Sequence, residues 1–225
     1  MSAQIKPIKV WGQGGPNPPK VIFILEELDL PHEIIFVALS DVKKPEYVAI
    51  NPNGRLPAIH DPNTNITLWE SGAIMEYLIE HYDTQHRLSF ARGTPEYYHA
   101  KQWLFFQTTG QGPYYGQAAW FIKYHPEKLP SVIERYNKEV NRVSGVLDGH
   151  LARQKMEHQG SNDNDGPWLV GHKLSYADLA FVPYQRRIGM LLEKDQFNVD
   201  DFPHVKEWLR KMTSRKTVKT VLEIA

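Results

Sequence analysis

The residues best suited to chemistry fall in three short segments of the first 75 positions. In the first, GQGGPNPP (residues 12–19), Asn17 stands between a glycine-rich turn and the start of a helix. Its amide can donate to an anion there. The turn holds no serine, cysteine, threonine or tyrosine. A loop of this composition can stabilise an anion but cannot supply a nucleophile. The glycines miss the dinucleotide-binding spacing, because Asn17 occupies the third glycine position.

The second segment is RLPAI, residues 55–59, which places Pro57 early in a strand. Proline cannot donate to a strand ladder and is typical of edge strands and bulges. If the bond from Leu56 to Pro57 is cis, the N–H and C=O of Leu56 turn outward and can pair with an extended peptide ligand. An ordinary edge-strand proline is the alternative, and this stretch alone favours it.

The third segment is WESGAI, residues 69–74, where Ser71 is predicted to be the N-cap of a helix. Its hydroxyl and the N–H groups behind it can bind a carboxylate. Glu70 can accept a hydrogen bond from an ammonium group. A zwitterionic amino-acid head suits this pair, and a plain capped helix is the alternative.

Composition excludes several classes of protein. The 225 residues carry 26 Lys and Arg against 26 Asp and Glu, which favours neither a nucleic-acid nor a membrane partner. Cysteine is absent, which excludes disulfide scaffolds and a catalytic thiol, and the ten histidines lack metal-ligand spacing. No signal core or long apolar run is present. We expect a soluble, cytoplasmic protein without a metal.

Two domains are expected to position these segments. Residues 1–84 predict the thioredoxin-like order βαβαββα, with strands at 8–11, 32–39, 55–61 and 66–69 and the main helices at 18–30 and 70–82. A linker at 85–94 precedes an all-helical domain over 95–225. Its first long helix is expected to be interrupted at Gly110, Gly112 and Pro113. Ser175 and Asp178 form a capping box that begins a core helix.

Together these motifs resemble a glutathione transferase over essentially the whole chain. NPNGRLPAI followed by WESGAIMEYL is similar to the glutathione-binding signature of that family, and WLVGHKLSYADLAFVP to its C-terminal capping motif. PNPPKV, WLFFQTTGQGPYYGQ and IERYNKEVNRV resemble the nu class and the fungal relatives of yeast's prion-forming nitrogen regulator. The regulator's long Asn/Gln-rich segment is missing. The resemblance implies a glutathione transferase fold with glutathione as co-substrate.

By this resemblance, Asn17 contacts the sulfur of glutathione and stabilises its thiolate without taking the proton. The backbone of Leu56 pairs with the cysteinyl unit beside a cis Pro57. Glu70 and Ser71 hold the γ-glutamyl head.

Three cations are carried over in the same way. Arg55 and Lys43 are expected near the site, and Arg135 matches an arginine that reaches glutathione across a dimer. Two positions depart from the subgroup pattern, because Val42 and Gly15 stand where polar side chains are common. Both departures bear on catalytic strength more than on binding.

The resemblance implies an enzyme that transfers or oxidises glutathione, with disulfide reductase or peroxidase activity and a place in detoxification. Its partners would be a small electrophile, disulfide or peroxide, and the protein would be a homodimer. Without a protein cysteine, disulfide reduction needs two glutathione molecules. The alternative is a glutathione-binding regulatory or scaffold protein with little turnover.

Overall fold

The computed structural model describes residues 4–157 and 166–224. These residues form two compact units, one comprising the chain up to residue 87 together with residues 215 onward, and the other residues 88–214. The first unit is a mixed sheet with helices, and the second is entirely helical. The predicted class, a thioredoxin-like α/β domain followed by a helical bundle, is confirmed.

The sheet of the first unit has four short strands: β1 (Ile8–Trp11), β2 (His32–Ile35), β3 (Ala58–Asp61) and β4 (Ile66–Trp69). Their order across the sheet is β2-β1-β3-β4. β1 runs parallel to β2, whereas β1 with β3 and β3 with β4 are antiparallel. The parallel pair follows from the helical crossover between β1 and β2.

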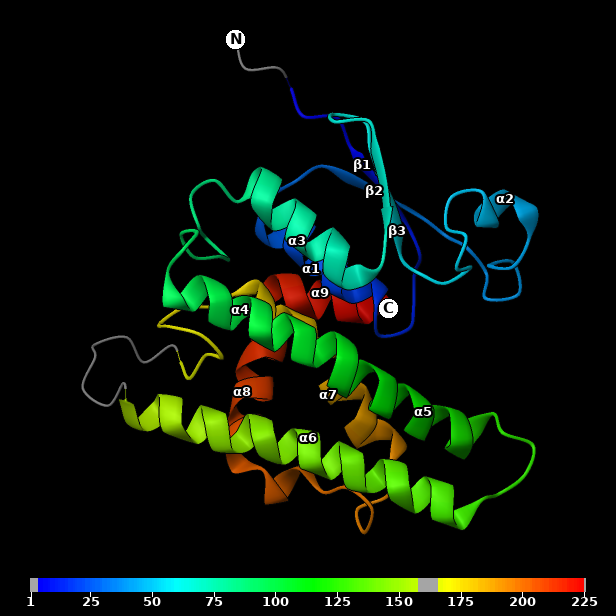
Figure 1. Cartoon of the computed structure of the whole chain (residues 1–225), viewed down its shortest axis with the longest axis vertical. Helices are drawn as coiled ribbons and strands as arrows, with labels where there is room; N and C mark the ends of the chain where they lie inside the picture. The colour runs from blue at the N-terminus through cyan, green and yellow to red at the C-terminus, as the bar shows by residue number, and fades with distance from the viewer. Residues whose placement is uncertain (1–3, 158–165, 225) are drawn as a thin grey trace. The chain divides into compact units, whose positions relative to one another are not determined.

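The helices of the first unit are α1 (Pro18–Glu27), α2 (Pro45–Val48), α3 (Ser71–Tyr82) and α9 (Lys216–Ile224). α1 and α3 lie side by side, and α2 lies apart from them (Figure 1). α9 also packs against α1, where Arg215 forms an ion pair with Glu27 at 3.0 Å. Because α3 and α9 both cover it, α1 is buried at every residue from Pro18 to Leu25.

Apolar side chains from the sheet and from α1 and α3 build the core of this unit. Val10, Ile59, Leu25, Ile74 and Leu78 are completely buried. Burial of one such side chain contributes about 1.5–3 kcal/mol. This core holds the ends of the strands and the starts of α1 and α3 in fixed positions.

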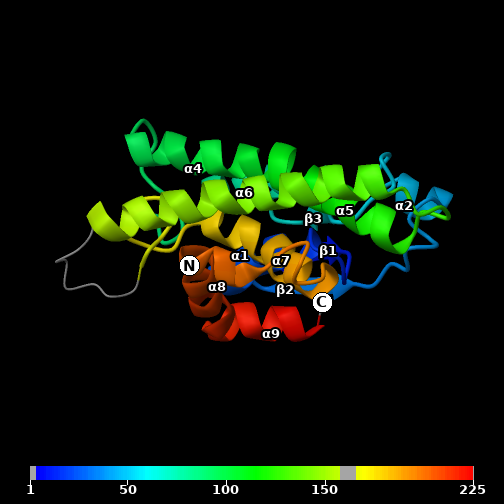
Figure 2. The same cartoon turned by 90° about the horizontal axis from the view of Figure 1, so that it is seen from below.

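The second unit contains α4 (Pro95–Phe106), η1 (Gln107–Gln111), α5 (Gly112–Lys123), α6 (Pro130–Glu157), α7 (Tyr176–Leu191), η2 (Val199–Asp201) and α8 (Pro203–Ser214). α4, η1 and α5 follow one another without a break, and α5 packs along α6 (Figures 1 and 2). The expected interruption is a π-helical turn at η1. Such turns widen a helix by one residue.

Buried polar side chains form a hydrogen-bond network at this π-helical turn. Gln111 Nε2 donates to Gln185 Oε1 at 3.2 Å, and the Tyr115 hydroxyl donates to the same oxygen at 3.0 Å. Tyr115 also shares a 2.8 Å hydrogen bond with Ser144. The network satisfies polar groups in the helical core, as burial requires.

The capping box predicted for Ser175 and Asp178 is present at the start of α7. Over the described ranges, no helix is long and apolar enough to cross a membrane.

Candidate functional site

Three loops of the first unit meet at one end of the sheet. Trp11, the last residue of β1, pairs with Ala58, the first residue of β3, and Ala58 pairs with Trp69, the last residue of β4. The residues just after Trp11, just before Ala58 and just after Trp69 therefore lie at the same end of these strands, which we call the sheet edge. Antiparallel pairing thus gathers segments 12–17, 55–57 and 70–71 of the sequence.

Asn17 occupies the N-cap position of α1, but its side chain does not cap the helix. The side chain of Asn17 makes no hydrogen bond to any other residue in the described part of the chain. Pro18 and Pro19 follow it and carry no N–H, and the N–H of Lys20 donates to the backbone oxygen of Asn17 at 3.2 Å. The half-buried Asn17 amide is therefore the donor that this helix start can present to a ligand.

Gly12 brings the loop of Asn17 against the segment of Leu56. A Cβ atom at Gly12 would lie 3.1 Å from Leu56 Cβ and 3.2 Å from Pro18 Cγ, at a φ of +127°. The Leu56–Pro57 bond is cis, as the family resemblance implied. Leu56 lies before the first residue of β3 and outside its ladder. Its backbone is placed to pair with an extended ligand.

A tight turn carries Arg55 and joins Lys43 to Glu70. Tyr47 Oη and Asn51 Nδ2 donate to the Arg55 carbonyl oxygen at 2.8 and 2.7 Å, and the Arg55 side chain is exposed. In the same turn, Lys43 Nζ donates to the backbone oxygen of residue 53 at 2.7 Å. The side-chain amide of that residue, Asn53, donates to Glu70 Oε1 at 3.3 Å. Lys43 and Glu70 therefore lie on either side of Asn53, in the turn that also carries Arg55.

Glu70 and Ser71 stand at the junction of β4 and α3. Glu70 has a φ of +71°, an uncommon conformation for a residue other than glycine and one that is concentrated at functional sites. The prediction that Ser71 is the N-cap was wrong, because Glu70 is the N-cap and Ser71 is the first helical residue. The first N–H of α3 to bond within the helix is that of Ile74, to Glu70 O. The N–H groups before it point out of the helix beside Ser71.

The structure adds Lys20, which the sequence analysis missed. Lys20 is the third residue of α1 and is 1% exposed, and its Nζ lies 3.5 Å from Ser71 Oγ. Burial lowers the pKa of its ammonium group to about 7, and the nearby Glu70 carboxylate acts in the opposite direction. The sequence carries one signal for it, since Lys20 is the only polar residue in PPKVIFIL.

Two further expectations concern Arg135 and Val42. Arg135 lies on α6 in the second unit and is exposed, so it is not among the side chains that the three loops bring together. Val42 is buried in an apolar cluster with Tyr47 and Ala58. It therefore serves packing beneath the loop that carries Lys43.

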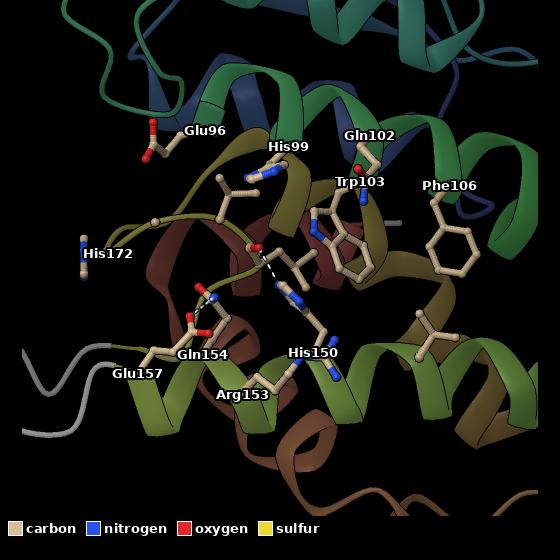
Figure 3. A pocket seen from close by; sticks show the side chains of 14 residues that line it. Glu96, His99, Gln102, Trp103, Phe106, His150, Arg153, Gln154, Glu157 and His172 are labelled. Carbon is tan, nitrogen blue, oxygen red and sulfur yellow. Dashed lines mark hydrogen bonds between the residues drawn. The ribbon is translucent and has the colours of Figure 1, made fainter. Parts of the chain in front are cut away.

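A hollow of about 770 Å³ lies within the second unit, lined by residues of α4, of α6 and of segment 169–172 (Figure 3). Several of its polar groups interact with neighbours. His150 Nε2 lies 2.7 Å from Leu169 O, and the ring of His150 is 4.5 Å from that of Trp103. Gln154 Nε2 donates to Glu157 at 3.0 Å. None of the residues predicted from the sequence lines this hollow, so the candidate site is the sheet edge of the first unit.

The sheet edge suits a peptide that carries several charges. The three loops carry an amide donor, a backbone segment outside the strand ladder, a carboxylate and a hydroxyl beside a helix N-terminus, with the cations Lys43 and Arg55 in the adjoining turn. Within the described ranges, no three His, Cys, Asp or Glu side chains gather as metal ligands would.

Comparisons with known proteins agree on one family. The family model described as Glutathione S-transferase, N-terminal domain, matches residues 15–81, and that described as Glutathione S-transferase, C-terminal domain, matches residues 118–224. The glutathione S-transferase-like protein gedE of Aspergillus terreus is 62% identical, over 98% of this chain and 96% of that protein. The glutathione transferase URE2P6 of Phanerochaete chrysosporium, solved with oxidized glutathione, is 44% identical with a TM-score of 0.87, covering 99% and 97%. Ure2p in complex with glutathione is 35% identical with a TM-score of 0.89, covering 98% and 96%.

Proposed function

The chain belongs to the glutathione S-transferase family, and from that premise we propose that it binds glutathione at this sheet edge and activates the thiol. Related structures bind glutathione or its oxidised form. The observation that carries the proposal for this chain is the Asn17 side-chain amide, which has no hydrogen-bond partner among the described residues and belongs to a loop that approaches Leu56 at Gly12.

Asn17 would act on the thiol as a hydrogen-bond donor. A free thiol has a pKa of about 8.5 and is mostly protonated at neutral pH. An amide N–H favours the thiolate over the thiol, because a donor interacts more strongly with an anion. Since Pro18 and Pro19 remove two N–H groups from the helix start, the side chain of Asn17 supplies the donor. The thiol proton leaves to solvent.

The rest of the peptide would be held by the surrounding segments. The Leu56 backbone pairs with the cysteinyl unit, in the manner of an added strand. Glu70 accepts from the γ-glutamyl ammonium group, while Ser71 and the first N–H groups of α3 donate to its carboxylate. Lys43 and Arg55 border the region where a second carboxylate would lie.

The second substrate would be a disulfide, a peroxide or a small electrophile. For a disulfide, the activated thiolate attacks one sulfur, forms a mixed disulfide with glutathione and releases the other half as a thiolate. The thiolate of a second glutathione then attacks the glutathione sulfur of the mixed disulfide, which forms oxidised glutathione and releases the remaining half of the substrate as a thiolate. This route suits a chain without cysteine, and the oxidized glutathione bound to URE2P6 supports it.

A panel assay tests this proposal, in which the protein is given glutathione with a mixed glutathione disulfide, a hydroperoxide or an aromatic electrophile. We expect turnover above background with at least one of the first two. Glutathione binding without turnover on any of the three would favour the alternative, a binding or scaffold protein. Absence of glutathione binding would contradict both.

Glu70→Ala and Ser71→Ala are each expected to weaken glutathione binding about tenfold, the loss of one charge-assisted hydrogen bond. Both residues hold a part of the ligand remote from the sulfur, so the thiolate pKa of bound glutathione should move little. Titration calorimetry measures the affinity, with Glu33→Ala, an exposed glutamate of β2, as the matched control. Wild-type affinity in both variants would contradict the assignment.

We also propose a cytoplasmic homodimer in which Arg135 of one subunit reaches the glutathione of the other. The exposed Phe105 and Trp120 of α4 and α5 support an apolar contact surface. We expect a dimer in sedimentation at micromolar concentration. Arg135→Ala should weaken glutathione binding several-fold without dissociating the dimer, whereas Arg187→Ala, also exposed, should not. A monomeric protein would remove the role of Arg135.

A further inference from the structure

Lys20 is the one buried lysine or arginine among the residues that the structure describes. It lies on α1, between Pro19 and Val21, in a run of eight buried residues. A buried ammonium group is unfavourable unless hydrogen bonds and an opposite charge compensate it. Two groups that compensate it belong to the candidate site, because Nζ is 3.5 Å from Ser71 Oγ and Glu70 supplies an opposite charge.

We propose that Lys20 is a positioning residue of the glutathione site, which turns the hydroxyl hydrogen of Ser71 toward the ligand by donating to the serine oxygen. This inference rests on the proposed function, since the ligand carboxylate beside Ser71 is that of glutathione.

The chemistry of the two groups explains the effect. An ammonium group has three donors and no acceptor, so a charged Lys20 engages a lone pair of Ser71 Oγ. The hydroxyl hydrogen is then available to the carboxylate of the ligand. A neutral amine has a lone pair and accepts the hydroxyl hydrogen instead, which turns the serine lone pairs toward the carboxylate. The protonated form of Lys20 is therefore the form that favours binding.

The charge state of Lys20 changes near neutral pH. Burial lowers its pKa to about 7. An anionic ligand at Ser71 favours the ammonium form, so the pKa of Lys20 is higher in the complex than in the free protein. Binding must then take up protons, and the contribution of Lys20 to affinity must fall as the pH rises through 7 to 8.

Other titratable groups stand on the helices packed against α1. On α3 and the residue before it these are Glu70, Glu76, Tyr77, Glu80, His81 and Tyr82, and on α9 they are Lys216, Lys219 and Glu223. Of these, the Glu70 carboxylate is the one that shifts the pKa of Lys20. The Glu70 side chain is exposed to solvent.

The test uses S-hexylglutathione, whose sulfur cannot ionise, so that the thiol adds no pH dependence. Affinities of the wild type and of Lys20→Met are compared from pH 6 to 8. If the pKa rises by about one unit on binding, the wild type should bind about ninefold more tightly than the variant at pH 6 and about twofold at pH 8. At pH 7.5, calorimetry in two buffers should show an uptake of about 0.5 proton that the variant lacks.

Two further variants keep the test decisive. Ser71→Ala should bind weakly and lose the pH dependence assigned to Lys20, even if Lys20→Met does not fold. Lys44→Met, at an exposed lysine of the same unit, should follow the wild type. A constant ratio between wild type and Lys20→Met across pH 6–8, or a Ser71→Ala profile that parallels the wild type, would overturn the proposal. Failure of the wild type to bind S-hexylglutathione would instead refute the proposed function.

Discussion

Replacement of Asp178 by alanine is expected to destabilise the protein by about 3–5 kcal/mol, because several buried donors lose their acceptor together. Asp178 is completely buried. One carboxylate oxygen accepts from Leu169 N at 2.9 Å and from Trp208 Nε1 at 3.0 Å, and the other accepts from Ser175 N and Oγ at 3.1 and 2.9 Å. The carboxylate thus joins the start of α7 to segment 169 and to α8. Chemical denaturation measures the loss.

A matched control and a pH series make this prediction specific. Asp195→Ala, at an exposed aspartate of the same unit, should change stability by no more than about 0.5 kcal/mol.

Burial raises the pKa of Asp178 to about 6, although its four hydrogen bonds oppose the rise. In the unfolded chain the pKa is about 3.9. The stability contributed by this group is therefore full below about pH 4 and declines as the pH rises through 6. The deficit of Asp178→Ala should be larger at pH 4.5 than at pH 7, and a smaller deficit at pH 4.5 would contradict this account.

Asn17→Ala is expected to raise the thiolate pKa of bound glutathione by about one to two units, toward that of the free thiol. One charge-assisted hydrogen bond is worth roughly 1.5–3 kcal/mol, and one pKa unit corresponds to about 1.36 kcal/mol. Turnover at neutral pH should fall about 10- to 100-fold, because less thiolate is present. Binding should change much less, since Leu56, Glu70 and Ser71 hold the peptide elsewhere. A pH titration of thiolate absorbance with glutathione bound measures the shift.

Asn17→Asp separates hydrogen-bond donation from the shape of the turn. It keeps the size of the side chain but has no N–H, so its thiolate pKa should be at least as high as that of Asn17→Ala. If Asn17 only shaped the turn between Pro16 and Pro18, both variants would lower stability and leave the thiolate pKa unchanged. That result would refute the role proposed for Asn17.

The fold could be predicted from local patterns of the sequence. The alternation of apolar strands with an apolar helix in the first 85 residues indicates βαβαββα, and sterics then require the parallel pairing of β1 with β2. The capping box at Ser175 and Asp178 could be predicted because both partners lie within one turn of helix. Gly110, Gly112 and Pro113 indicated that the long helix is interrupted. They did not indicate that the interruption is a π-helical turn, because such a turn depends on which side chains the core must accept.

The candidate site could be predicted in part, because its residues lie in three short segments of the sequence. The sequence by itself determined that Asn17 stands at a helix start, in a turn without serine, cysteine, threonine or tyrosine, and that Glu70 and Ser71 adjoin a helix N-terminus. Only the tertiary structure decided that these residues share one edge of the sheet, because the pairing of β1 with β3 joins positions about 50 residues apart.

Two further features, the placement of α9 and the burial of Lys20, depend on tertiary packing and could not be predicted from the sequence. The strongly amphipathic α9 follows the helices of the second unit in sequence, yet it packs on α1, because an apolar face specifies that a helix is covered and not which element covers it. Lys20 reads in sequence as a lysine in an apolar run. It becomes a buried charge beneath Ser71 only when α3 and α9 enclose α1, since burial and the distance to Ser71 are properties of the assembled unit.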